Sequence, residues 1–289
     1  MSAILPFLRF LVITRRYMAL LGVAVIVIFA VAALAAPLLF DWTTATRVNL
    51  GDALATPSLD LPLGADEMGR NMIARLVWGA RTSLLVAGVS VGAALLAGLL
   101  IGGLCGYYDN RASFITMRAM DAIISFPRIL LAIMLITILG PGMTSLTLAI
   151  AISSVPVFAR LFRGPVLSLK SRDFVLASRS LGAGDMRLLF RHVLPNIASL
   201  VIVQGSISLA EAVLIASGLS FLGLGPQPPV PEWGAMIAQS RSHLMSTPHV
   251  VLAPGIALFL LVLSLNLVGD GLRDFTDPKS TRISPGAAP

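Results

Sequence analysis

Charged residues are scarce in this sequence, because Asp, Glu, Lys and Arg together make up 12% of its 289 residues. Soluble chains carry roughly 25% charged residues. Apolar residues account for 56% of the chain, and the mean hydropathy is +0.89. A water-soluble core cannot bury that much apolar surface, so the composition excludes an ordinary soluble domain and predicts an all-α integral membrane protein.

Cysteine and lysine are also nearly missing. Cys105 is the single cysteine, which excludes a disulfide framework and a multi-cysteine metal site. The three histidines lie apart without a carboxylate or cysteine pattern around them, so we predict no metal site. Neither Lys170 nor Lys279 follows a glycine, so the phosphate-binding sequence G-x-x-x-x-G-K-[ST] is lacking. We therefore expect no enzyme activity and no cofactor on this chain.

Long uncharged runs predict six membrane-spanning helices, since about 20 apolar residues cross the hydrocarbon core. Tyr17–Phe40, Thr82–Tyr108 and Val250–Gly269 are three such runs. Gly140-Pro141-Gly142 splits a further run into one helix ending near Leu139 and one beginning near Thr144, and a fifth span follows Pro195. The predicted segments are 1–16, 17–40, an extracytoplasmic loop at 41–80, a core at 81–270 that includes a cytoplasmic loop (165–194) and an extracytoplasmic loop (221–249), and a tail at 271–289.

Basic residues predict the orientation. With a cytoplasmic N-terminus, 15 of the 21 Lys and Arg residues lie on the cytoplasmic side. The positive-inside rule then places both termini in the cytoplasm. A basic excess arranged between apolar runs is typical of membrane topology and gives no reason to expect nucleic acid. Within the second span, glycines spaced by four, at Gly88 and Gly92 and at Gly98, Gly102 and Gly106, predict close helix packing.

The cytoplasmic loop 165–194 is longer than a connection between two helices requires. Ser171 can cap a helix that begins at Arg172, and Gly182 can end it in the left-handed conformation. Asp185 can cap a second short helix, and Pro195 can open the next span. The loop is therefore predicted to be an ordered pair of short helices.

The first of these helices carries a small apolar face. The 3, 4 and 7 spacing places Phe174, Ala177, Ser178 and Leu181 together. This face suits docking of another protein, and it equally suits an amphipathic helix lying on lipid headgroups. Periodicity leaves both interpretations open.

The same loop resembles the EAA loop of ABC-transporter permeases, whose pattern is E-A-A, three residues, G, nine residues, then I-x-L-P. Gly182, Leu194 and Pro195 match in register. Leu176 occupies the usual Glu position, Ser178 replaces the second Ala, and His192 takes the Ile position. The resemblance implies that the loop couples the chain to an ATPase, through Phe174, Leu176, Ala177, Ser178, Leu181, Gly182, Asp185 and Pro195.

Further motifs resemble the C-type permease of the dipeptide, oligopeptide and nickel importer family, with features of the glutathione and peptide importers. They are Leu63–Arg70, Gly79–Leu84, Leu219–Gly225, Pro231–Gly234, Asn266–Asp274 and Asp277–Lys279. The resemblance implies a type I ABC importer permease fold with six spans, in the bacterial cytoplasmic (inner) membrane, forming half of a translocation pore for peptides or a peptide-like solute.

The resemblance also implies partners: a B-type permease in a heterodimer, two ATPase subunits or domains that bind ATP and Mg, and an extracytoplasmic solute-binding protein. Nickel chelates and opines are alternative solutes within the family. A proton-coupled secondary transporter with Glu211 as carrier is the alternative from another class. It would need coupled carboxylates or inverted repeats, which the sequence does not display.

Charges at membrane depth are candidates for the pathway or for partner contacts. Arg118 and Asp121 are three residues apart and can form an ion pair on one helix. Glu211 lies inside the fifth span, where an ionisable group faces a cavity or forms a buried hydrogen bond. In the proline-rich segment 225–234, Trp233 is predicted either to anchor a surface for the binding protein or to lie in the interfacial aromatic belt.

Overall fold

In a computed structural model the chain is described from residue 4 to residue 276, with side chains from residue 17 to residue 275. This part of the chain is helical and forms no β-strand. The helices, in chain order, are α1 (Ile4–Leu39), α2 (Trp42–Thr46), η1 (Leu50–Asp52), α3 (Met72–Tyr108), α4 (Arg111–Ile124), α5 (Arg128–Leu139), α6 (Met143–Lys170), α7 (Asp173–Ser180), α8 (Asp185–Arg187), η2 (Leu188–Val193), η3 (Leu194–Ile197), α9 (Ala198–Phe221), α10 (Trp233–Ser240), η4 (Arg241–His243) and α11 (His249–Thr276).

Five helical segments are long and apolar enough to cross a membrane, and a sixth span results if the bent pair α4 and α5 counts as one. The axes of α4 and α5 differ by 92°. The break falls at Phe126-Pro127, and α5 ends at Leu139 as predicted. Proline lacks the N–H that would continue the helix, so the bend has a local cause.

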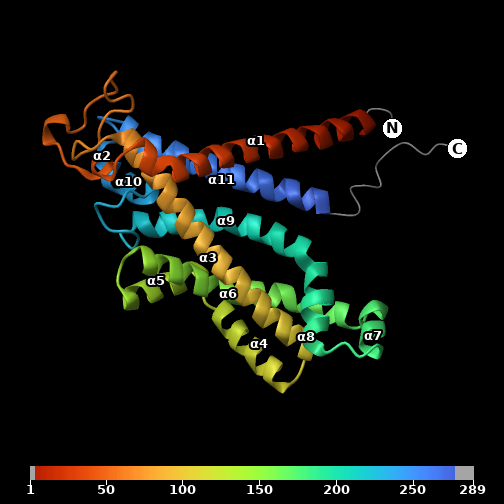
Figure 1. The fold of residues 1–289 in the computed structure, drawn as a ribbon. Coiled ribbons are helices and arrows are strands. Elements are labelled where there is room, and N and C mark those ends of the chain that lie inside the picture. Colours follow the sequence, from red (N-terminus) through yellow and green to blue (C-terminus); the bar gives the residue numbers. More distant parts are fainter. Residues whose placement is uncertain (1–3, 277–289) are drawn as a thin grey trace.

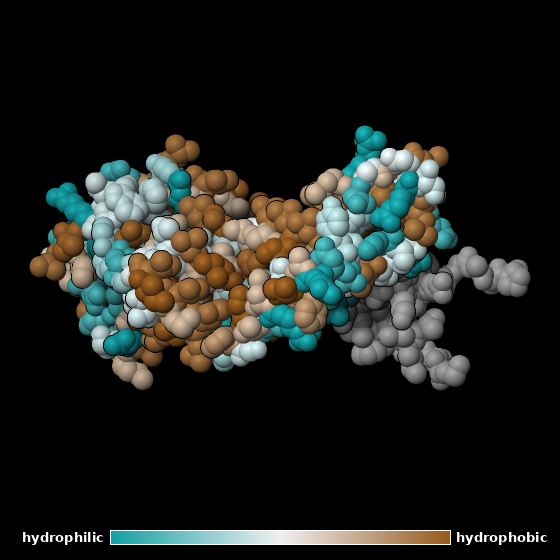
Figure 2. Space-filling model, turned by 90° about the horizontal axis from the view of Figure 1, so that it is seen from below, coloured by the Kyte–Doolittle hydropathy of each residue, from teal (hydrophilic) through white to brown (hydrophobic). Residues whose placement is uncertain are grey.

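The helices form a bundle with two different ends (Figure 1). One end carries α2 and α10, and we call it the α10 end. The other end carries α7, and α1 begins and α11 ends on that side of the bundle. Hydrophobic side chains cover the middle of the face in Figure 2, and hydrophilic side chains gather toward both ends. This distribution matches a molecule surrounded by lipid at its waist.

Two helices extend beyond the predicted spans. Helix α3 begins at Met72 instead of Thr82, so residues 72–80 of the predicted loop 41–80 are helical. The Asn71 side chain caps this start by accepting a 3.0 Å hydrogen bond from the Ala74 N–H. Helix α6 continues to Lys170 and takes up the first residues of the predicted loop 165–194. Buried packing of Val166 accompanies this extension.

Helices α3 and α6 form the central contact of the bundle. A Cβ atom on Gly98 would lie 2.4 Å from the Phe158 Cβ, and one on Gly102 would lie 2.3 Å from the Ala159 carbonyl oxygen. Gly106 faces the Arg163 carbonyl in the same way. These three glycines confirm the predicted packing. The prediction is wrong for Gly88 and Gly92, whose Cβ positions meet no described atom within 4 Å.

Candidate functional site

The loop between α6 and α9 places apolar side chains on the protein surface. Phe174, Leu176 and Leu181 are 43%, 45% and 89% exposed, and Ala177 is exposed between them. Val175 is fully buried and anchors α7 to the rest of the chain. We call the exposed residues Phe174, Leu176, Ala177 and Leu181 the α7 patch. An exposed apolar patch of this kind marks an interaction surface.

The end of α7 follows the predicted geometry. Gly182 has a φ of +86°, which an L-residue rarely adopts. The Ala183 N–H donates to the Ser178 carbonyl at 3.1 Å, closing the last turn. The Ser178 hydroxyl donates to the Phe174 carbonyl at 2.8 Å, so this side chain is used within the helix. Gly182 therefore fixes the direction in which the chain leaves α7.

The predicted caps of the two short helices are wrong. Helix α7 begins at Asp173 with Arg172 as its cap residue, and the Ser171 hydroxyl instead donates to the Ser168 carbonyl. Gly184 is the cap residue of α8, and Asp185 is its first residue. The Asp185 carboxylate instead accepts a hydrogen bond from the hydroxyl of Tyr107.

Tyr107 connects this loop to α3. Its hydroxyl donates to Asp185 at 2.7 Å and accepts from Arg179 at 2.8 Å, and its side chain is buried. Lys170 lies 5.8 Å from the ring centroid. Tyr107 was not among the predicted site residues. A tyrosine at the end of an apolar run is only a weak indication of a functional contact. The partners of Tyr107 lie 72 and 78 residues further along the chain, so local sequence patterns do not reveal them.

Two irregular turns join α8 to α9. Leu188–Val193 is π-helical, and Leu194–Ile197 forms a 3-10 turn that contains Pro195. Pro195 thus lies at the start of the fifth span, as predicted. Leu188, Leu189 and Val193 are buried and tie this joint to the core. The α7 patch is therefore connected to α9 through a packed joint.

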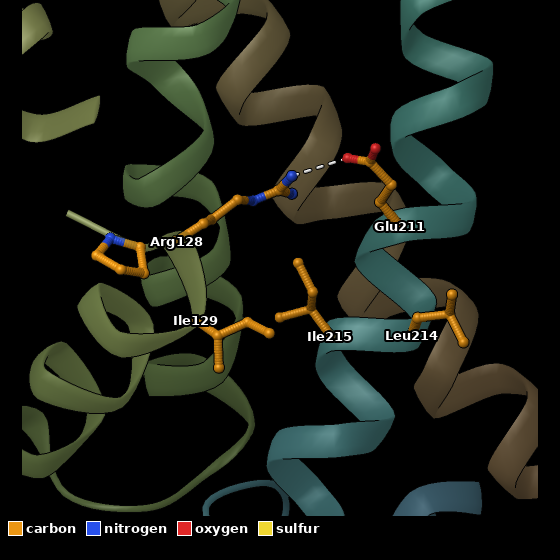
Figure 3. A pocket seen from close by; sticks show the side chains of 6 residues that line it. Arg128, Ile129, Glu211, Leu214 and Ile215 are labelled. Atoms are coloured by element: carbon orange, nitrogen blue, oxygen red, sulfur yellow. Dashed lines mark hydrogen bonds and ion pairs between the residues drawn. The ribbon is translucent and has the colours of Figure 1, made fainter. Parts of the chain in front are cut away.

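Glu211 on α9 and Arg128 at the start of α5 form an ion pair. Arg128 Nη1 lies 2.9 Å from Glu211 Oε2, and the two side chains face each other across the space between their helices (Figure 3). An open pocket of about 420 Å³ adjoins the pair, lined by Pro127, Arg128, Ile129, Glu211, Leu214 and Ile215. The Glu211 side chain is 52% exposed. Glu211 is therefore half exposed beside an open pocket and is at the same time paired with Arg128.

The predicted ion pair between Arg118 and Asp121 is wrong. Asp121 pairs with Arg160 of α6, and the Arg118 guanidinium lies 5.1 Å from the ring centroid of Phe114. A spacing of three residues permits a pair on one helix, but α6 offers Asp121 a partner from a neighbouring helix. A second pair, Arg163 with Asp109 at 2.8 Å, joins α6 to the turn after α3.

Both predictions for Trp233 are wrong, because its side chain is fully buried. The indole N–H donates to the Leu76 carbonyl at 3.0 Å, and the ring meets Phe29 edge to face at 5.3 Å. The preceding Glu232 is also buried, and its carboxylate accepts from the Ala235 N–H at 2.8 Å and from Ser83 at 3.4 Å. These residues hold α10 against α3.

No group of three His, Cys, Asp or Glu side chains within the described residues has the arrangement of a metal site. The described residues offer two features for contacts with other molecules: an exposed apolar patch at one end, and an ion pair beside a pocket between α5 and α9.

Known proteins resemble this chain in sequence and in fold. A dipeptide transport system permease protein, DppC, of Alkalihalophilus pseudofirmus is 41% identical over 265 residues, 92% of this chain and 87% of the relative. A glutathione transport system permease protein, GsiD, of Pectobacterium atrosepticum is 46% identical, covering 81% of this chain and 76% of the relative. A di/tripeptide permease, DppC, of Pseudomonas aeruginosa is 48% identical over 75% of this chain and 72% of the relative.

Among solved structures, a chain of the MetNI methionine ABC transporter, in an inward-facing conformation, superposes with a TM-score of 0.58 at 21% identity. The match covers 71% of this chain and 98% of that chain, and it shows a shared fold. Residues 98–282 match the family described as binding-protein-dependent transport system inner membrane component. The chain belongs to this family and is a multi-pass inner-membrane permease of an ABC importer.

Proposed function

We propose that this permease forms one half of the translocation pore of a peptide importer, for dipeptides, oligopeptides or a peptide-like solute such as glutathione. The printed names of the relatives, which are dipeptide, di/tripeptide and glutathione permeases, support this solute class. The other half of the pore is a B-type permease. An extracytoplasmic binding protein delivers the solute, and two ATPase subunits or domains bind ATP and Mg.

The α7 patch is the observation that carries the coupling mechanism. Phe174, Leu176 and Leu181 expose apolar surface at the end of the molecule where α1 begins, and a complementary socket on an ATPase would bury it. Tyr107 ties the loop to α3, and the turns η2 and η3 lead into α9. ATP-driven movement of the ATPases would thus reach both helices.

The proposed orientation places the α7 end in the cytoplasm and the α10 end outside. The excess of basic residues in the segments at the α7 end supports this direction. The loop 221–249 and residues 41–71 then face the binding protein. The cis peptide bond Pro228-Pro229 and the exposed Gln227 lie in this outer segment.

The coupling role is tested by Leu181→Arg, because Leu181 is 89% exposed and the variant should fold normally. We expect the permease pair to purify intact but to lose its ATPase subunits, or to keep them with ATP hydrolysis that no longer responds to the loaded binding protein. Phe275→Arg is the matched control, since Phe275 is 88% exposed and lies near the end of α11, outside the α7 patch. Retention of ATPase subunits and normal coupling in Leu181→Arg would remove the α7 patch from the mechanism.

A further inference from the structure

The ion pair between Arg128 and Glu211 joins two helices that pack on different neighbours. Helix α5 packs on α6, whereas α9 packs mainly on α11 and α3. The two residues are 83 positions apart in the sequence, and their side chains meet beside the open pocket (Figure 3). Attraction between charges therefore holds α5 and α9 together here, and a competing charge can separate them.

The two partners differ in their access to the pocket. The Arg128 side chain is 24% exposed, and its Nε and Nη2 atoms are buried without a described acceptor. The Glu211 side chain is 52% exposed, and its second carboxylate oxygen points away from Arg128. A ligand entering the pocket therefore meets the carboxylate, while the N–H groups of the guanidinium that lack an acceptor are out of its reach.

The rest of the pocket is apolar. Ile129 of α5 and Leu214 and Ile215 of α9 form its walls together with Pro127. A carboxylate at membrane depth costs roughly 2.5–3.5 kcal/mol without compensation, and Arg128 supplies the compensating charge. A complementary ligand carries a cationic group next to an apolar side chain. The buried Nε and Nη2 atoms of Arg128 are not available to an anion in the pocket.

We propose that Glu211 binds the ammonium group of the transported solute, and that Arg128 is the counter-ion which this ammonium displaces. The ion pair between Arg128 and Glu211 is formed when the pocket is empty, and it separates when a solute with a free amino terminus binds. Competition with Arg128 keeps binding weak, which suits a site that must release its ligand on the other side. The proposal rests on the proposed function as a peptide permease and adds the chemical group that is recognised.

The test uses the permease pair with its ATPases in lipid nanodiscs, without the binding protein, and radiolabelled trialanine as the probe. We expect saturable binding, competition by trialanine amide, and at least tenfold weaker competition by N-acetyl-trialanine, which lacks the ammonium. Glu211→Gln should weaken trialanine binding at least tenfold. Arg128→Gln should strengthen it severalfold, because the competitor is removed. Asp270→Asn, which changes an exposed carboxylate on α11 away from the pocket, is the control and should have no effect.

The opposite signs of the two variants separate this proposal from a purely structural ion pair. Weaker binding in both variants, or loss of the partner permease from Glu211→Gln preparations, would overturn it, as would absence of saturable binding to the unmodified complex. Uptake of trialanine by the complete importer in proteoliposomes is measured in parallel. If uptake also fails, the proposed peptide function is contradicted; if uptake succeeds without binding at this site, only the role of Glu211 is.

Discussion

Glu232 illustrates how burial at the α10 end sets the protonation of a single carboxyl group. Burial raises the pKa of Glu232 above its ordinary value, although hydrogen bonds from the Ala235 and Gly234 N–H groups act in the opposite direction. The folded protein therefore holds a proton that the unfolded chain has already released once the pH exceeds the ordinary glutamate pKa. Folding stability consequently falls as the pH rises from that value towards the raised pKa.

We expect Glu232→Gln to remove this pH dependence, because the amide keeps the shape and cannot ionise. Melting temperatures of the purified permease complex at pH 5 and pH 7 measure the effect. The variant should gain stability relative to the unmodified complex between pH 5 and pH 7. An identical difference at both values would show that Glu232 titrates as an ordinary exposed carboxyl group.

Tyr107 is a second residue whose role can be tested, because its hydroxyl forms hydrogen bonds with both Asp185 and Arg179. Hydrogen bonds to charged groups contribute about 1.5–3 kcal/mol each, so Tyr107→Phe should loosen the loop from α3 while leaving the ring in place. We predict that ATP hydrolysis continues and that the solute transported per ATP falls at least tenfold, because a factor of ten corresponds to about 1.4 kcal/mol, less than either bond contributes.

Tyr108→Phe provides the control for this change, because Tyr108 is 40% exposed and contacts Tyr107 through its ring at 5.4 Å. Proteoliposome assays that record uptake and phosphate release together give the ratio. If the two phenylalanine variants couple equally well, the hydrogen bonds at Tyr107 have no part in transmission.

At the level of elements, the contact between α3 and α6 depends on backbone approaching backbone. Gly102→Ala would place a Cβ 2.3 Å from the Ala159 carbonyl oxygen, so the helices must separate. Overpacking of this kind costs about 1–3 kcal/mol. Gly88→Ala on the same helix meets nothing within 4 Å and is the matched control. We expect a melting temperature several degrees lower for Gly102→Ala alone, and equal values would contradict the packing role of Gly102.

The bent pair α4 and α5 shows which elements local sequence can and cannot predict. The Phe126-Pro127 kink and the Gly140-Pro141-Gly142 turn are local signals, and both boundaries followed them. The bend angle, and the ion pairs of Asp121 with Arg160 and of Arg128 with Glu211, depend on how separate helices approach. Spacing rules relate residues on one helix only, so they proposed Arg118 as the partner of Asp121.

Over the whole molecule, apolar run lengths predict the five long spans, and the motifs together predict the fold family. Trp233 is a residue whose environment the sequence pattern predicts wrongly. An aromatic residue in a proline-rich segment between spans is typical of a membrane interface, yet α10 folds inward and buries it. Only the long-range contact with Leu76 and Phe29 decides its environment.

The orientation of the whole chain is testable because Cys105 is its single cysteine and is buried. In a Cys105→Ser background, we predict that Leu59→Cys reacts with a membrane-impermeant maleimide in cells whose outer barrier is opened but whose cytoplasmic membrane is intact. Arg111→Cys, on an exposed residue at the start of α4, should react only after that membrane is permeabilised. The reverse pattern would invert the proposed topology.

The bonds between α10 and α3 also impose an order on biosynthesis. Ser83 bonds to Glu232 across 149 residues of sequence, and the Leu76 carbonyl receives the Trp233 N–H across 157. While a ribosome translates the chain, helix α3 enters the membrane long before either partner has been made. The α10 end of α3 is therefore completed late, by the last part of the chain. A nascent chain stopped before residue 232 contains the first spans but lacks both of these contacts at the α10 end.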